Sequence, residues 1–282
     1  ANIRHARQLN AFIRDNGYDA VVCSHLFPME TLTFLRRWER CDVKCYGILS
    51  DYTCIPFLAE TDLDAYFLPH SEVRELCIQT GMPAEKLIVS GMPVAARFLA
   101  PMDKAAARAA LGLPADKRIY LIMTGGIGCG DAVSLCDAIR RVPDENALLC
   151  VLPGRNEALR PALEDAYHGQ GVLTVPFTDQ VPAYMHAADV LLSKAGGISS
   201  SEAAMLGVPL VHTMAIPGVE TENAAFFARH GLSFFARSVD EAARFADRLI
   251  YDPVCAERML AAQSACLPRN GAEQIAAAIT AQ

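Results

Sequence analysis

Two glycine-rich segments in the second half of the chain could bind a phosphate group. Residues 124–130 read Thr-Gly-Gly-Ile-Gly-Cys-Gly, and the second segment contains Gly196, Gly197 and Ser199. Each follows an apolar run and precedes a helical pattern. Glycine lets backbone N–H groups approach a phosphate, and a helix N-terminus favours an anion. A tight turn also requires glycine, but the first segment lacks the lysine of a Walker loop, which excludes ATP hydrolysis of that type.

Carboxylate, amide and guanidinium groups stand beside these segments. Glu202 could accept hydrogen bonds from the paired hydroxyls of a ribose, or it could form a capping box with Ser199, which lies three residues earlier. Glu220 and Asn223 share one face of a predicted helix, where they could hold sugar hydroxyls or simply favour the helix N-terminus. Arg155 follows another apolar run and could bond a base or a phosphate.

A parallel sheet would bring these side chains together. Short runs rich in Val, Ile and Leu alternate with amphipathic segments, the pattern of parallel strands joined by crossover helices in an α/β protein. The predicted strands are residues 19–24, 44–50, 65–68, 86–90, 118–123, 147–152, 172–175, 190–192 and 209–212. Because carboxyl ends of parallel strands share one edge of a sheet, the four polar loops should converge in one domain.

The chain is long enough for two domains. It has 282 residues, and single cores stop growing efficiently near this length. Residues 91–101 contain two prolines and no strand or helix pattern, which predicts a linker. We therefore expect a first domain at residues 1–96 and a second at 97–282. Three helices predicted at 238–251, 253–267 and 271–281 end the second domain.

Composition excludes several classes of protein. The net charge of −7 argues against a general nucleic-acid binder, so no nucleic-acid partner is expected. The ten cysteines show no paired zinc or redox spacing and are predicted to be small buried hydrophobes, with no metal centre and no cofactor. No apolar stretch is long enough to cross a bilayer, and the chain opens without a signal peptide.

One aromatic and basic cluster could contact a membrane surface. Phe34, Arg37 and Trp38 stand at helical spacing among further basic residues. Aromatic rings with cationic neighbours suit the headgroup region of an anionic membrane. The alternative is that Trp38 packs in the core beneath extended arginines.

The order of motifs from residue 124 to residue 224 resembles the family 28 glycosyltransferases. It is most similar to monogalactosyldiacylglycerol synthases and bacterial diacylglycerol glucosyltransferases, with the peptidoglycan enzyme MurG as a more distant relative. The resemblance implies a GT-B fold, in which two Rossmann-like doubly wound parallel-sheet domains face a cleft. The C-terminal domain of such enzymes binds a UDP-sugar, and the N-terminal domain meets a lipid acceptor.

The resemblance also implies roles for individual residues. It places Gly196, Gly197 and Ser199 on the diphosphate, Glu202 on the ribose, Arg155 and the backbone near Phe177 about the uracil, Glu220 and Asn223 about the donor sugar, and Gly126 and Gly128 in the loop facing the cleft. On the acceptor side it implies weaker roles for His25 and Asp51. Ala195 and Val219 replace the family's usual proline and glutamine, which leaves the donor sugar open among glucose, galactose and N-acetylglucosamine.

The family's opening strand and Gly-Gly-Gly-His type loop do not precede Ala1, so we expect a fragment with a truncated N-terminal domain and no assignable catalytic base. The expected function is inverting transfer of a hexose from a UDP-sugar to a diacylglycerol-type lipid, at the inner face of the cell membrane and on an anionic surface. The alternatives are a UDP-N-acetylglucosamine 2-epimerase and a nucleotide-sugar-binding protein without turnover. The oligomeric state is left open.

Overall fold

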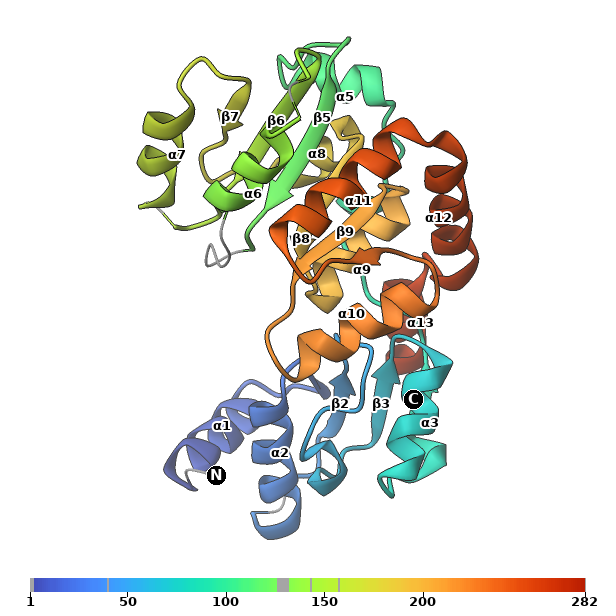
Figure 1. Ribbon diagram of the computed structural model, residues 1–282. Helices are drawn as coiled ribbons and strands as arrows, with labels where there is room; N and C mark the ends of the chain where they lie inside the picture. The colour runs from blue at the N-terminus through green and yellow to red at the C-terminus, as the bar shows by residue number, and fades with distance from the viewer. Residues whose placement is uncertain (1–2, 40, 126–131, 143, 157, 282) are drawn as a thin grey trace. The chain divides into compact units, whose positions relative to one another are not determined.

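The computed structural model describes residues 3–39, 41–125, 132–142, 144–156 and 158–281 (Figure 1). It divides into two compact units, one made of Ala1–Pro93 with Pro268–Gln282 and the other of Val94–Leu267. We call them unit 1 and unit 2. Each contains its own parallel sheet, as the alternation of apolar runs and amphipathic segments predicts.

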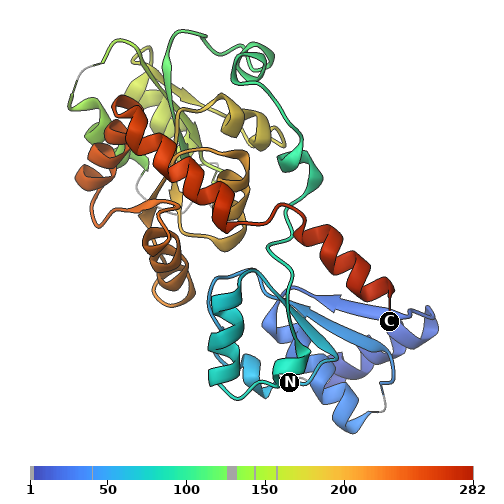
Figure 2. The same ribbon diagram turned by 90° about the vertical axis from the view of Figure 1, so that its right-hand side faces the viewer.

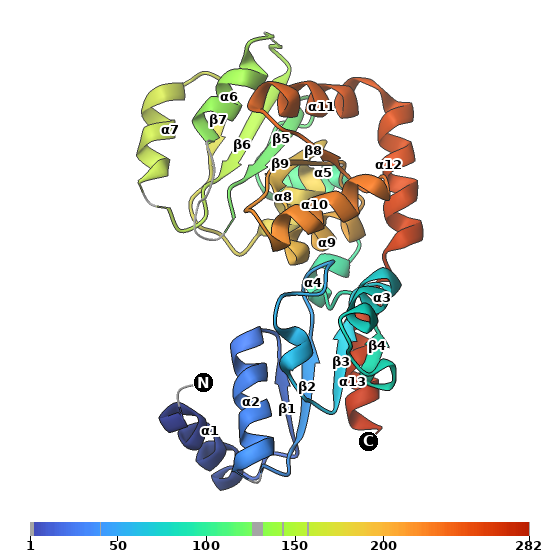
Figure 3. The ribbon, with the colours of Figure 1, turned by 60° about the horizontal axis from the view of Figure 1, so that its bottom comes forward.

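Unit 1 has a four-stranded sheet with the order β1-β2-β3-β4 (Figure 3). All pairs are parallel, and all four residues of β3 are buried. The elements are α1 (Ile3–Asp15), β1 (Ala20–Cys23), α2 (Leu26–Trp38), β2 (Lys44–Ile48), η1 (Leu58–Glu60), β3 (Ala65–Leu68), α3 (Ser71–Gln79), η2 (Ala84–Lys86) and β4 (Leu87–Val89).

The last helix, α13 (Gly271–Thr280), returns to unit 1 (Figure 2). Its Ile275 packs with Tyr46 and Phe67 of the sheet. Gly271 permits this return, since a Cβ atom there would lie 2.5 Å from the carbonyl oxygen of Met92. The sequence boundary at residue 97 had grouped this helix with the second domain, because an apolar face does not reveal which sheet it covers.

Unit 2 has a six-stranded parallel sheet with the order β10-β9-β8-β5-β6-β7. Read from β7, this is the doubly wound order in which the direction of winding reverses between β5 and β8. The elements are α4 (Ala96–Leu99), α5 (Lys104–Ala110), β5 (Arg118–Met123), α6 (Ala132–Arg140), β6 (Ala147–Leu152), α7 (Leu159–Tyr167), β7 (Val172–Thr174), α8 (Val181–Ala187), β8 (Val190–Lys194), α9 (Gly197–Leu206), β9 (Leu210–Met214), α10 (Val219–Arg229), β10 (Phe234–Phe235), α11 (Val239–Tyr251) and α12 (Pro253–Cys266).

The predicted linker is not free of regular structure. Residues 91–101 contain the helical turn α4, which packs against α9 and buries Phe98. The sequence missed this turn because four residues are too few to show a helical period. The structure confirms all nine predicted strands and contains one more, the two-residue β10.

Candidate functional site

The reversal between β5 and β8 defines the candidate site in unit 2. Ligands of open α/β sheets bind outside the carboxyl ends of strands at such a point. A cavity of about 200 Å³ lies there, lined by Met123 and Thr124 at the end of β5, Lys194 at the end of β8 and Thr213 of β9. The two glycine segments leave the sheet at these same strand ends. Gly126 and Gly128 of the first segment lie outside the described residues.

The second glycine segment opens helix α9. Gly196 is the N-cap, and its carbonyl oxygen accepts hydrogen bonds from Ser200 N at 3.0 Å and Ser199 Oγ at 3.4 Å. Ser199 therefore lies in the first turn rather than at the cap. The capping box between Ser199 and Glu202 is thus wrong, since Glu202 lies a full turn beyond the positions that a capping box uses.

Glu202 is a partly buried carboxyl group on α9. Burial raises the pKa of Glu202 to about 7, while the positive charge of Arg97 on α4 acts in the opposite direction. Burial disfavours the charged form of an acid. Glu202 is therefore about half ionised near neutral pH, and it does not cap the helix. A ligand that donates hydrogen bonds to this carboxyl group would stabilise its ionised form.

Lys194 and Glu220 form an ion pair across the site. The other carboxylate oxygen of Glu220, Oε2, accepts a hydrogen bond from Ile216 N at 3.0 Å. Gly125, at a φ of 77°, allows the lysine stem to cross, since a Cβ atom there would lie 2.8 Å from Lys194 Cε. The sequence reasoning overlooked Lys194, although its place between an apolar strand and a Gly-Gly pair was a usable signal.

Replacing Gly125 with alanine is expected to lower the free energy of unfolding by about 1–2 kcal/mol for the left-handed backbone alone. The clash with the tethered Lys194 side chain should add to this loss. Gly112 is the matched control, because it has a φ of 65° and a Cβ atom there would meet nothing within 4 Å. Chemical denaturation of both variants gives the comparison. Equal losses would show that Lys194 moves aside freely.

Asn223 stabilises the turn at Ala195, between β8 and α9. Its side chain is fully buried, and Nδ2 donates to the carbonyl oxygen of Ala195 at 3.2 Å. Glu220, predicted to act beside it, instead faces Lys194. The structure therefore does not bring these two side chains together around an open sugar position, and Asn223 holds the Ala195 turn in shape.

Arg155 and Phe177, by contrast, do come together. The guanidinium carbon of Arg155 lies 5.5 Å from the centre of the Phe177 ring, which is 66% exposed. They leave the sheet after β6 and β7. A cation over an exposed aromatic ring offers planar surfaces and hydrogen-bond donors, both of which suit a nucleobase.

His212 of β9 holds the first turn of helix α9 in place. Its Nε2 lies 2.9 Å from Ser200 Oγ and its Nδ1 3.1 Å from Ser233 Oγ, and the residue is fully buried. Burial lowers the pKa of His212 to about 3, so the ring is neutral in ordinary buffers. A neutral imidazole between two hydroxyls ties the first turn of α9 to the sheet without placing a charge beneath the site.

In unit 1, His25 and Asp51 follow the neighbouring strands β1 and β2. His25 is exposed and caps α2, with Nδ1 accepting from Phe27 N at 3.3 Å, and Asp51 lies in the loop after β2. Among the described residues, no group of three His, Cys, Asp or Glu side chains could hold a metal ion. No helix within the described part of the chain is long and apolar enough to cross a membrane.

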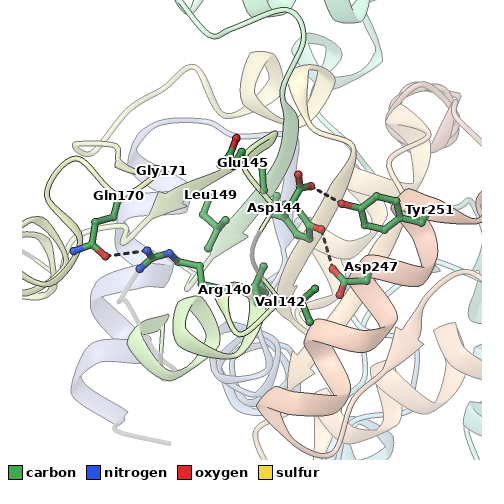
Figure 4. Close-up of a pocket in the computed structure, with 12 residues that line it drawn as sticks. Arg140, Val142, Asp144, Glu145, Leu149, Gln170, Gly171, Asp247 and Tyr251 are labelled. Carbon is green, nitrogen blue, oxygen red and sulfur yellow. Dashed lines mark hydrogen bonds between the residues drawn. The ribbon is translucent and has the colours of Figure 1, made fainter.

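A second cavity of about 290 Å³ lies at the amino ends of β5 and β6 (Figure 4). Tyr120 Oη donates to Asp247 Oδ1 at 2.8 Å, and Tyr251 bonds Asp144. These polar groups bond one another beside the cavity, and Gly196, Gly197 and Ser199 do not line it. The carboxyl end of the sheet is therefore the better candidate site.

Comparisons with known proteins agree with the fold. Residues 2–94 match the family model of monogalactosyldiacylglycerol (MGDG) synthase, and residues 142–243 match that of the glycosyltransferase family 28 C-terminal domain. Unit 2 thus corresponds in large part to a glycosyltransferase C-terminal domain. The predicted resemblance is confirmed: the N-terminal part of the chain is similar to MGDG synthases, and the second half is similar to the C-terminal domain of family 28 glycosyltransferases.

Two relatives are similar to most of this chain. The processive diacylglycerol beta-glucosyltransferase of Bacillus cereus (strain B4264) is 26% identical over 98% of this chain and 71% of its own length. That of Bacillus mycoides (strain KBAB4) is 27% identical over 87% of this chain and 63% of its own length.

The crystal structure of Acinetobacter baumannii MurG covers 98% of this chain and 77% of its own, with a TM-score of 0.68 at 15% identity. The crystal structure of a putative UDP-N-acetylglucosamine 2-epimerase from Listeria monocytogenes matches 98% of this chain and 78% of the epimerase chain, with a TM-score of 0.75 at 15% identity. At such identities the likeness concerns the fold, and it confirms the predicted GT-B class.

Proposed function

We propose that this protein transfers a hexose from a UDP-sugar to a diacylglycerol-type lipid with inversion at the anomeric carbon. The observation that carries the donor half is the placement of Lys194 beside the start of α9, at the strand-order reversal of unit 2, with the partly buried Glu202 one turn further along that helix. The names of the relatives, which are processive diacylglycerol beta-glucosyltransferases, support the acceptor half.

The reaction would be a direct displacement at the sugar. The acceptor hydroxyl forms a bond to the anomeric carbon while the bond from that carbon to the diphosphate oxygen breaks, and the hydroxyl proton passes to a base. The backbone N–H groups at the start of α9 and the Lys194 ammonium would stabilise the departing diphosphate. Glu202 would hold the ribose hydroxyls, and Arg155 with Phe177 would hold the base.

A transfer assay tests this proposal directly. The chain is incubated with diacylglycerol vesicles and UDP-glucose, UDP-galactose or UDP-N-acetylglucosamine, and glycolipid is measured by mass spectrometry. Glycolipid formed from one of the three sugars supports the proposal and identifies the donor. Conversion of UDP-N-acetylglucosamine to its C2 epimer, followed by NMR, would favour the epimerase instead. UDP binding without either product would favour the non-catalytic protein.

Unit 1 offers a surface suited to a lipid bilayer. Trp38 at the end of α2 is 75% exposed and Phe27 at its start is 69% exposed. The interpretation of Trp38 as a core residue is therefore wrong. Phe34 is partly buried and Arg37 is exposed, so the predicted cluster presents a cation and an indole ring to solvent. Such a combination favours an anionic membrane surface, and it supports peripheral association with the inner face of the cell membrane.

Replacing Trp38 with alanine is expected to weaken binding to anionic phospholipid vesicles about fivefold, since partial burial of an indole ring contributes ~1 kcal/mol. The melting temperature should not fall, because the exposed ring has little packing to lose. Vesicle co-sedimentation measures the first quantity and calorimetry the second. Val142→Ala, which shortens an exposed apolar side chain of unit 2, is the control. Unchanged vesicle binding would remove Trp38 from the contact surface.

A further inference from the structure

Two cysteines from different elements of unit 1 meet at the end of α3. Cys54 lies in the loop after β2, and its Sγ is 3.5 Å from Thr80 Oγ1. The Thr80 hydroxyl in turn donates to the carbonyl oxygen of Cys77 at 2.8 Å. Thr80 thus holds the thiol of Cys54 against the last turn of α3, which carries Cys77. The fold therefore brings together two cysteines whose separation in the sequence showed no redox spacing.

The two thiols are not equivalent. Cys54 is partly exposed, whereas Cys77 is fully buried on the inner face of α3. The neighbouring Cys77 side chain lowers the pKa of Cys54 to about 6, against the effect of burial. The same contact raises the pKa of Cys77. Cys54 is thus the accessible thiolate, and Cys77 keeps its proton.

We propose that Cys54 and Cys77 form an oxidant-reactive pair, in which a peroxide oxidises Cys54 and Cys77 then closes a reversible disulfide. In the first step the Cys54 sulfur attacks a peroxide oxygen, the O–O bond breaks, and water leaves with the added proton. In the second step the Cys77 sulfur attacks the resulting sulfenic acid, and a second water leaves. Two thiols are oxidised and one hydrogen peroxide is reduced to two waters, so the atoms balance.

The disulfide would fix a loop that already has an unusual backbone. Phe57, three residues after Cys54, has a φ of 66°, the one positive value among the described non-glycine residues. The same loop carries Asp51, which the family resemblance places on the acceptor side. A bond from Cys54 to Cys77 would tie this loop to α3, while the donor site in unit 2 contains neither sulfur. The pair does not depend on the proposed function.

The test begins with the reduced 282-residue chain and dilute hydrogen peroxide at neutral pH. Peptide mapping by mass spectrometry should find a Cys54–Cys77 disulfide that dithiothreitol reverses. Cys255 is the matched control, because it is also partly exposed but pairs with no second thiol among the described residues. Iodoacetamide should alkylate Cys54 faster than Cys255 by at least ~tenfold, since the thiolate is the reactive form.

Variants separate the two steps. In Cys77→Ser, peroxide should leave a sulfenic acid on Cys54 that dimedone traps, and in Cys54→Ser no disulfide to Cys77 should form. Should either substitution prevent folding, the mapping and alkylation rates of the unaltered chain still decide the question. Oxidation of Cys54 at the rate of Cys255, or peroxide treatment that yields no Cys54–Cys77 link, would overturn the proposal.

Discussion

Replacing Lys194 with methionine should weaken the binding of UDP about tenfold to a hundredfold, the loss of ~1.5–3 kcal/mol expected for a charged hydrogen bond. Methionine keeps the length of the apolar stem that crosses Gly125 but removes the ammonium group. Because the ammonium lies at the ends of β5 and β8, its charge should act on the diphosphate and not on the nucleoside. The affinity for uridine should therefore change little.

Calorimetric titration of both ligands measures this difference. Lys104→Met is the control, since Lys104 also pairs with a carboxylate, Asp189, but contributes nothing to the cavity at the carboxyl ends of β5 and β8. Retained UDP affinity in a folded Lys194→Met variant would contradict the role of Lys194. Equal losses for UDP and uridine would indicate a general distortion of the site, which the melting temperature would reveal.

The second large effect is a pH dependence carried by Glu202. Ribose hydroxyls donate hydrogen bonds and so select the ionised carboxylate, whereas burial raises the pKa of the free group to about 7. Below pH 7, each decrease of one pH unit should lower the affinity for UDP-glucose by up to about tenfold, because Glu202 must release a proton when the ligand binds. UDP-glucose is the ligand to use, since its diphosphate does not titrate in this range.

Glu202→Gln should remove this dependence and weaken binding at pH 8 by ~1–3 kcal/mol. Repeating the titration in buffers of different ionisation enthalpy counts the protons released at pH 7. A pH-independent affinity in the unaltered protein would exclude Glu202 from the ribose.

The stability of the ligand-free protein should follow the opposite trend with pH. A carboxyl group whose pKa is raised on folding contributes stability when protonated, and it loses that contribution as the pH rises from about 4.5 through about 7. Thermal unfolding at pH 5 and pH 8, compared with Glu202→Gln, measures this trend. The glutamine variant should lose less stability between the two pH values than the unaltered chain.

The sequence predicted the sheets better than it predicted what packs on them. Nine apolar runs became nine strands, because burial on both faces of a parallel sheet leaves a continuous apolar signal. The return of α13 to unit 1 was missed, since Ile275 would satisfy the same pattern against either sheet. The turn α4 was missed because Phe98 alone anchors it.

The sequence predicted which loops lie at the candidate site, but it did not predict what all of their side chains contact. Glu202 and the Arg155–Phe177 pair lie where the motifs placed them in the chain and at the sheet edge that strand polarity dictates. Asn223 has turned to the Ala195 carbonyl, and Lys194 holds Glu220. Such pairings depend on distances between loops that are far apart in sequence, and a single sequence does not contain those distances.

The most direct test of donor binding is a calorimetric titration of this chain with UDP, ADP and GDP. A site formed by Arg155, Phe177, Lys194 and Glu202 predicts selective binding of UDP, because the shared diphosphate leaves only the base to discriminate. Binding of none of the three, or equal binding of all, would contradict a UDP-sugar site at the carboxyl ends of β5 and β8.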